Sequence, residues 1–180
     1  MSLLLLLPLR GMAQVERGSS ADDYLRFTPL VSVYVMKGCG VDSRSTWKEL
    51  LVNSALSVAT SSAVAYSLKY TISSERPDHT DDHGFPSGHA TFSFVGATVL
   101  HKEYGHLSPW VSVAGYGVAT GVGVSRVLRD HHTWWQVASG AAIGVLSTEL
   151  SYWLGDRLTG RGKQLDLAAS PVGLSVAYRF

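Results

Sequence analysis

Residues 86–100 read PSGHATFSFVGATVL, in which a turn-forming tetrapeptide leads directly into an apolar run. Ser87 supplies a hydroxyl donor and an N-cap for a helix that begins near this residue, and Gly88 lets the backbone approach an anion closely. The first turn of that helix presents free N–H groups and a favourable dipole. The stretch therefore predicts a helix whose N-terminus forms part of an anion-binding pocket, with His89 beside the bound group. The alternative is an ordinary loop-to-helix junction with a surface histidine.

Three further helices are predicted around this one. Apolar residues recur at threes and fours over residues 46–74 without a proline, and Pro77 is expected to stop that helix at Arg76. A serine-proline pair starts a second helix before the apolar residues 110–124, and the last helix runs over about residues 133–154, where Gly155 ends it. Four glycines are expected to permit close packing of the second helix, namely Gly115, Gly117, Gly121 and Gly123.

The composition favours an all-α fold that buries its helices on most sides. The chain has 180 residues, enough for one domain with a sizeable core. Only 16% of its residues are charged and 46% are hydrophobic, whereas a soluble domain has roughly a quarter charged. A compact helical bundle and a bundle partly embedded in a membrane both fit these numbers. The net charge of +1 gives no signal for nucleic-acid binding.

The chain divides into four segments by pattern. Residues 1–13 contain a short apolar core and a cleavage-like site, as in a secretory signal peptide, although a frayed N-terminus that is never cleaved is the alternative. Residues 14–45 are interpreted as a connector and residues 46–160 as the helical domain. Within the tail, residues 161–180, apolar and polar residues alternate from Val172 onward and predict one short C-terminal strand. We expect an exported protein, periplasmic or membrane-associated with its site facing the periplasm.

Several basic side chains in this sequence are suited to holding a phosphoryl group, whose transfer depends on positioning and charge stabilisation. Lys69 and Arg76 are seven residues apart, nearly two helical turns, so both can project from one helix face, although such pairs are often solvated charges. Arg126 offers a planar fork for two phosphate oxygens. The unperturbed pKa of a histidine lies near neutrality, so His132 is suited to act as a nucleophile or a base there.

Taken together, these residues resemble a known family. Lys69-x6-Arg76-Pro77, Pro86-Ser87-Gly88-His89 and Ser125-Arg126-x5-His132 are similar to the three signatures of the type 2 phosphatidic acid phosphatase superfamily, which also contains bacterial acid phosphatases and vanadium haloperoxidases. The similarity covers roughly residues 46–154. It implies an all-helical bundle with a phosphate pocket at the helix ends.

The resemblance also implies roles for the residues. His132 would attack phosphorus and form a phosphohistidine, His89 would act as the general acid on the leaving oxygen, and water would then hydrolyse the phosphoenzyme. Phosphatases of the family need no metal or other cofactor. Five residues would bind the phosphoryl oxygens: Lys69, Arg76, Ser87, Gly88 and Arg126.

Gln136 departs from the family pattern, which has aspartate four residues after the nucleophile. At that spacing a side chain can accept the N–H of the imidazole. Glutamine can still accept this bond but cannot neutralise an imidazolium, and Asp130 could supply a compensating charge. We therefore predict a working but slowed phosphatase, in which Gln136→Asp raises turnover.

Three functions are weighed. The first is a metal-independent phosphatase acting outside the cytoplasm on phosphate monoesters, with lipid or isoprenoid phosphates favoured by the low charge content. The second is a phosphate-binding or structural protein in which Gln136 has weakened catalysis. The third is a vanadate-dependent haloperoxidase, against which the short chain argues.

Three other features are given ordinary interpretations. The loop cluster Asp78, His79, Asp81, Asp82 and His83 fits no specific metal-ligand spacing and is interpreted as a solvated loop. Trp134 and Trp135 are expected to pack in the core, with a rim for an apolar substrate as the alternative. Cys39, the single cysteine, cannot form an internal disulfide and is read as a free thiol.

Overall fold

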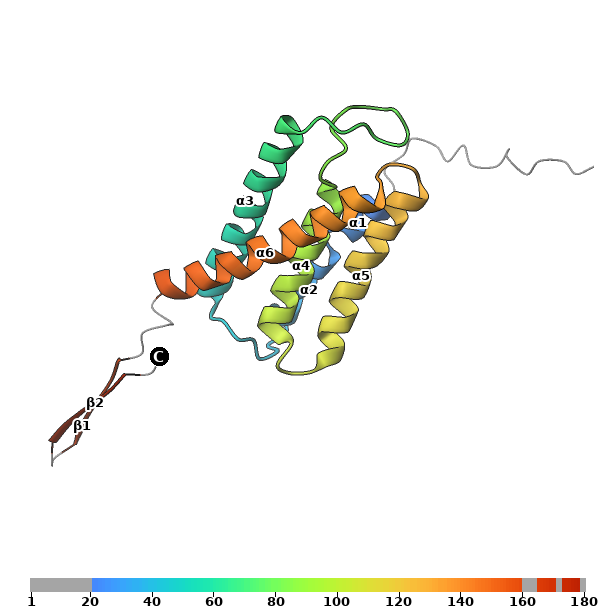
Figure 1. Cartoon of the computed structure of the whole chain (residues 1–180). Helices are drawn as coiled ribbons and strands as arrows, with labels where there is room; N and C mark the ends of the chain where they lie inside the picture. Colours follow the sequence, from blue (N-terminus) through green and yellow to red (C-terminus); the bar gives the residue numbers. More distant parts are fainter. Residues whose placement is uncertain (1–20, 160–164, 171–172, 179–180) are drawn as a thin grey trace, which may run out of the picture.

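The computed structural model describes residues 21–159, 165–170 and 173–178. The described residues form six helices and one hairpin (Figure 1). The helices are α1 (Ala21–Leu25), α2 (Thr28–Gly38), α3 (Trp47–Thr71), α4 (Gly88–Tyr104), α5 (Pro109–Leu128) and α6 (Trp134–Leu158). The strands β1 (Leu165–Ser170) and β2 (Gly173–Tyr178) pair antiparallel, with Leu165 opposite Tyr178.

The all-α prediction is confirmed for the bundle, and each long helix begins at a capping residue. Thr46 and Glu49 form a capping box at the start of α3, and Thr133 and Gln136 form one at the start of α6. Ser87 caps α4, which confirms the start expected there. The expected start of α5 is also confirmed, with its first residue a proline.

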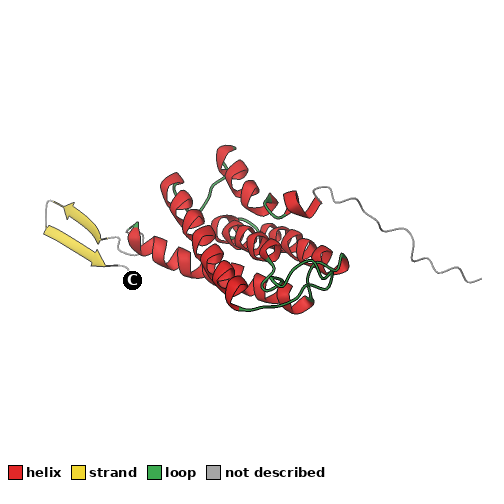
Figure 2. Cartoon of the chain, turned by 90° about the horizontal axis from the view of Figure 1, so that it is seen from above, coloured by secondary structure: helices red, strands yellow, loops and turns green. Residues whose placement is uncertain are grey.

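The central element of the bundle is α4. It contacts α2, α3, α5 and α6. Figure 2 shows the helices gathered into one bundle when they are seen from above. Eleven of its 17 residues are buried, so it is surrounded rather than packed on one face. The buried core unites residues of four helices: Val33, Leu50, Val95, Val99, Leu100, Tyr104 and Tyr152. The N-terminus of α4, which follows from the PSGH tetrapeptide, is thereby fixed by packing at one end of the bundle.

The described part of the expected connector, residues 21–45, contains two helices that pack on the bundle. Val33 of α2 is fully buried, and its carbonyl accepts a hydrogen bond from the Tyr104 hydroxyl at 3.1 Å. A Cβ on Gly96 of α4 would overlap the backbone of Leu30, so α2 lies directly against α4. Residues 21–38 therefore form part of the helical core. The apolar residues that follow residue 30 lie in α2, so this stretch is a helix and not a strand.

The end of α3 differs from the prediction. The helix ends at Thr71 and not at Arg76, because the following backbone pairs with itself in a loop. Within that loop, Ser74 N donates to Asp82 O at 2.9 Å and Arg76 N donates to Asp81 O at 3.1 Å. Arg76 therefore sits on a hydrogen-bonded loop and not on the same helix face as Lys69.

The glycines divide into those that allow close packing and those that do not. A Cβ on Gly140 would overlap the carbonyl oxygen of Ser87, and one on Gly144 would overlap that of Thr91, so both glycines let α6 approach α4. In α5, Gly115 and Gly123 are tightly packed as expected, but a Cβ on Gly117 or Gly121 would meet no atom within 4 Å. The packing role expected for those two is wrong within the described residues. Gly155 lies inside α6, which continues to Leu158, instead of ending it, and it packs directly against Asn53 of α3.

The C-terminal segment forms two strands where one was expected, and the signal-peptide prediction for residues 1–13 lies outside the described residues. Two helices, α3 and α5, are long and apolar enough to cross a membrane by length and composition.

Candidate active site

The residues of the three motifs converge at one end of the bundle. This end holds the N-terminus of α4, the C-termini of α3 and α5, the turn before α6 and the short α1 (Figure 1). Lys69, Arg76 and Arg126 all lie close enough to His132 to act on its charge state. The amide N–H of Ser87 donates to the carbonyl of Gln136 at 2.9 Å, which joins the second motif directly to α6. The structure therefore brings the predicted site residues together.

The turn between α5 and α6 explains the five-residue gap between Arg126 and His132. The amides of His131 and His132 donate to the Arg126 carbonyl at 3.0 and 3.3 Å, which folds the chain back over the C-terminus of α5. Asp130 takes a φ of 57°, a left-handed conformation that aspartate tolerates better than most residues. No hydrogen bond or ion pair joins Asp130 to His132 among the described residues, so Asp130 serves the turn.

His132 is buried, with 3% of its surface exposed. Its Nδ1 lies 3.1 Å from Oε1 of Gln136. Burial is the main cause that lowers the pKa of His132 to about 4, and the charges of Arg76 and Arg126 act in the same direction, against the Gln136 hydrogen bond. The imidazole is therefore neutral near pH 7.

Gln136 makes more contacts than the motif comparison suggests. Its Oε1 also accepts from the Thr133 amide at 3.0 Å, and its Nε2 donates to the Ser74 hydroxyl at 3.0 Å and the Glu75 carbonyl at 3.2 Å. The amide orientation follows from this network, since a backbone N–H faces one end and a carbonyl faces the other. Gln136 thus ties the loop that carries Arg76 to His132, and the sequence contains no signal for this link.

The three cations are held in different ways. Lys69 Nζ donates to the His83 carbonyl at 2.5 Å, and Arg76 Nε pairs with Asp81 Oδ1 at 2.9 Å, so the loop fixes both. Arg126 is 7% exposed, and its buried Nε has no hydrogen-bond partner among the described residues. A buried cationic N–H without an acceptor fits an anionic ligand that would complete its hydrogen bonds.

The start of α4 has the properties expected of an anion site. Ser87 is fully buried and its Oγ accepts from the Ala90 amide at 3.5 Å. A Cβ added to Gly88 would meet no atom within 4 Å, so open space adjoins the helix N-terminus at this residue. The dipole and the first-turn N–H groups of a helix favour an anion beside its N-terminus.

Two carboxylates from α1 enter the site, and the sequence analysis missed both. His89 Nε2 lies 2.7 Å from Asp23 Oδ1. Asp22 is 3% exposed; its Oδ2 accepts from the Ser125 hydroxyl at 2.9 Å and lies 3.9 Å from Arg126 Nη1. The sequence shows these two aspartates only as an adjacent acidic pair. Nothing local relates Asp23 to His89, 66 residues away, or Asp22 to Ser125, 103 residues away.

Two interpretations of neighbouring residues are tested by the structure. Two carboxylates of the loop cluster pair with protein groups, since Asp78 Oδ2 lies 2.8 Å from His131 Nδ1 and Asp81 pairs with Arg76. Burial tends to raise the pKa of Asp78, but hydrogen bonds from His131 and Thr80 lower it to about 2. Core packing of Trp134 and Trp135 is wrong: they are 60% and 73% exposed at the start of α6, beside the site.

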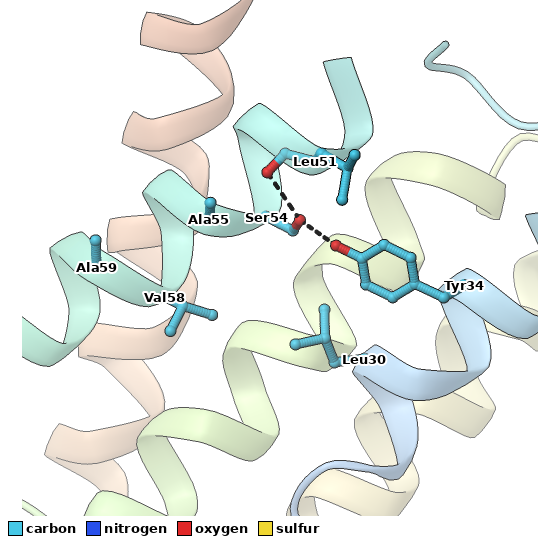
Figure 3. Close-up of a pocket in the computed structure, with 7 residues that line it drawn as sticks. All are labelled: Leu30, Tyr34, Leu51, Ser54, Ala55, Val58 and Ala59. Atoms are coloured by element: carbon cyan, nitrogen blue, oxygen red, sulfur yellow. Dashed lines mark hydrogen bonds between the residues drawn. The ribbon is translucent and has the colours of Figure 1, made fainter. Parts of the chain in front are cut away.

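A separate apolar pocket lies between α2 and α3 (Figure 3). Its volume is about 400 Å³, and Tyr34 points across it to the Ser54 hydroxyl. The lining residues are Leu30, Tyr34, Leu51, Ser54, Ala55, Val58 and Ala59. None of the motif residues lines this pocket, so it is distinct from the candidate active site.

Comparison with known proteins agrees with the geometry. The chain is 41% identical over 136 residues to "Lipid A 1-phosphatase" of Porphyromonas gingivalis, covering 75% of this chain and 31% of that protein. It is 33% identical over 93 residues to "Bacitracin transport permease protein BcrC" of Bacillus licheniformis, covering 50% of this chain and 42% of that one. The chain thus spans less than half the length of these two relatives.

A solved structure shares the fold. The crystal structure of Aquifex aeolicus LpxE matches with a TM-score of 0.56 at 21% identity, covering 72% of this chain and 82% of the other. The family model of the PAP2 superfamily matches residues 50–159, which include all three motifs and Gln136. With the motifs assembled around His132 and this match over more than half its length, the chain belongs to the PAP2 superfamily.

Proposed function

We propose that this protein is a metal-independent phosphatase that hydrolyses phosphate monoesters of lipids through a phosphohistidine on His132. The observation that carries the proposal is the pairing of a neutral, buried imidazole with a cationic pocket. The positive charges of Lys69, Arg76 and Arg126 all act on the His132 ring. Arg126 also has a buried N–H without a hydrogen-bond partner among the described residues. Such a pocket suits an anion with several oxygens.

The hydrogen bond that His132 donates to Gln136 decides which nitrogen attacks. Because Gln136 Oε1 can only accept, the proton of the neutral ring sits on Nδ1 and the lone pair on Nε2. In the first step Nε2 bonds to phosphorus while the ester P–O bond breaks, and His89 gives a proton to the leaving oxygen. In the second step water attacks phosphorus, His89 takes its proton, and the P–N bond breaks to release phosphate and free His132.

Three observations support a lipid substrate and membrane association. The first is similarity to a protein described as a lipid A 1-phosphatase. The second is the pair of helices with span-like length and composition, α3 and α5. The third is the exposed Trp134–Trp135 pair beside the site, since tryptophan is typical of the membrane–water interface. We place the protein at a membrane, with its site on the periplasmic side.

A turnover panel tests this function. Phosphate release is measured in detergent micelles from a lipid A-type glycosyl phosphate, phosphatidic acid, an isoprenoid phosphate and soluble 4-nitrophenyl phosphate. We expect a lipid phosphate to be the best substrate, and His132→Ala to lower its turnover by about 10³-fold or more, because the nucleophile is lost. His106→Ala is the matched control, since this exposed histidine lies beyond the other end of α4.

Two results would decide against the proposal. Hydrolysis that persists in His132→Ala would show that another group attacks phosphorus. A complete absence of hydrolysis with retained binding of inorganic phosphate would favour the alternative of a weakened, phosphate-binding protein.

A further inference from the structure

The short α1 contributes a carboxylate to one of the two histidines of the site. Asp23 Oδ1 lies 2.7 Å from His89 Nε2, and the His89 side chain is only 16% exposed. The neighbouring Asp22 holds α1 in place, because it accepts from Ser125 at 2.9 Å and lies 3.9 Å from both Arg126 and Arg129. Asp23 therefore approaches His89 from an element that is anchored on α5.

The two histidines of the proposed mechanism have different partners. His132 is held by the uncharged amide of Gln136, whereas His89 is held by the carboxylate of Asp23. A carboxylate stabilises an imidazolium, and an amide does not neutralise it. The charged Asp23 thus lies beside His89, which must carry an extra proton in the first step. The neutral Gln136 lies beside His132, which must not carry one.

The surroundings of His89 otherwise oppose its charged form. Burial lowers the pKa of His89, and so do Arg126 of α5 and Arg26, which follows α1. Asp23 raises that pKa, both by its hydrogen bond and by its charge. Among the described residues, Asp23 is the carboxylate that faces this ring and offsets the two arginines.

We propose that Asp23 is a positioning residue for the general acid, an inference that rests on the phosphatase function proposed above. Its carboxylate accepts the Nε2–H of His89, fixes the ring and stabilises the imidazolium, which leaves Nδ1–H to protonate the ester oxygen. As the P–O bond breaks, the proton passes from Nδ1 to the leaving oxygen, and Asp23 remains ionised throughout. The water that hydrolyses the phosphohistidine returns a proton to Nδ1.

Asp23→Asn tests this role through the leaving group. A simple alkyl phosphate needs protonation of its leaving oxygen, whereas 4-nitrophenolate leaves readily without it. We expect kcat for the alkyl phosphate to fall by about 10-fold or more, while kcat for 4-nitrophenyl phosphate changes by less than about threefold. The alkaline limb of the alkyl-phosphate profile should also move to lower pH, because His89 loses its proton more readily without the carboxylate. Asp42→Asn, at an exposed aspartate, is the matched control.

A double-mutant cycle separates positioning from a merely structural role. If Asp23 acts through His89, Asp23→Asn should cost nothing further in a His89→Ala background, and Asp23→Glu should recover part of the lost turnover. Equal losses on both substrates, an unmoved alkaline limb, or additive losses in the cycle would overturn the inference.

Direct titration keeps the inference separable from the proposed function. The pKa of His89, followed by NMR of the imidazole in wild type and Asp23→Asn, should fall in the variant whether or not the protein turns over substrate. An unchanged pKa would refute the contact itself, whereas a lowered pKa in a protein without His132-dependent turnover would refute the phosphatase function and with it the catalytic role of Asp23.

Discussion

Gln136 Oε1 accepts from the ring of His132 at 3.1 Å and from the Thr133 amide at 3.0 Å. The second of these bonds belongs to the capping box that starts α6. The side chain that initiates the helix therefore also selects the tautomer of the proposed nucleophile. The orientation of His132 is thereby coupled to the formation of α6, and a change at position 136 must affect both.

Replacing Gln136 by aspartate separates the charge at this position from its structural bonds. We expect Gln136→Asp to raise turnover and the pKa of His132, because a carboxylate stabilises the developing imidazolium. The unfolding midpoint should fall, because Ser74 and the Glu75 carbonyl lose their donor, at a cost of about 1–3 kcal/mol for a buried acceptor left unpaired.

Turnover against pH and thermal unfolding in the same detergent measure the two effects. Gln136→Asn is the matched control, since asparagine has the length of aspartate without its charge. A turnover in Gln136→Asp no higher than in Gln136→Asn would contradict the role given to the charge.

His132 should make the stability of the fold depend on pH. Its pKa is about 4 in the folded protein against an ordinary value of 6.5, so the unfolded chain binds the proton more readily. The contribution of His132 to the free energy of unfolding is fully present above pH 6.5 and is lost as the pH falls to about 4. The loss is on the order of 3 kcal/mol. Below pH 4 both states are protonated and the contribution stays constant.

Unfolding of wild type and His132→Gln, compared from pH 8 to pH 4, measures this difference. The two stabilities should converge as the pH falls through this range. Parallel curves would show that the imidazole is not held neutral by burial.

Gly140 should be intolerant of a methyl group, whereas Gly117 should accept one. A Cβ at position 140 would overlap the Ser87 carbonyl, so Gly140→Ala must move α6 away from the start of α4, at about 1–3 kcal/mol. Gly117 is exposed and its Cβ position is open, so Gly117→Ala should be neutral or stabilise α5 by about 0.5–1 kcal/mol.

Thermal unfolding and phosphate release report the two consequences. Turnover should fall in Gly140→Ala alone, because Ser87 and His132 are positioned by these two helices. Equal behaviour of the variants would mean that the α4–α6 contact does not organise the site.

The sequence alone determined the helical fold, the starts of α3, α4, α5 and α6, and the set of motif residues around His132. These features are local: a cap lies within three residues of the amides it satisfies, and the motif residues other than Arg76 lie at or near a helix end. The same local pattern could not place Arg76, because the backbone of its loop pairs with itself and ends α3 at Thr71.

Only the tertiary structure decided which groups complete the site. Asp23 reaches His89 across 66 residues of chain, and Gln136 reaches Ser74 across 62. It also decided that Gly140 packs while Gly117 does not. These outcomes depend on the distance and the rotation at which the helices meet. Side-chain volumes across the whole bundle set both quantities, so no single stretch of sequence encodes them.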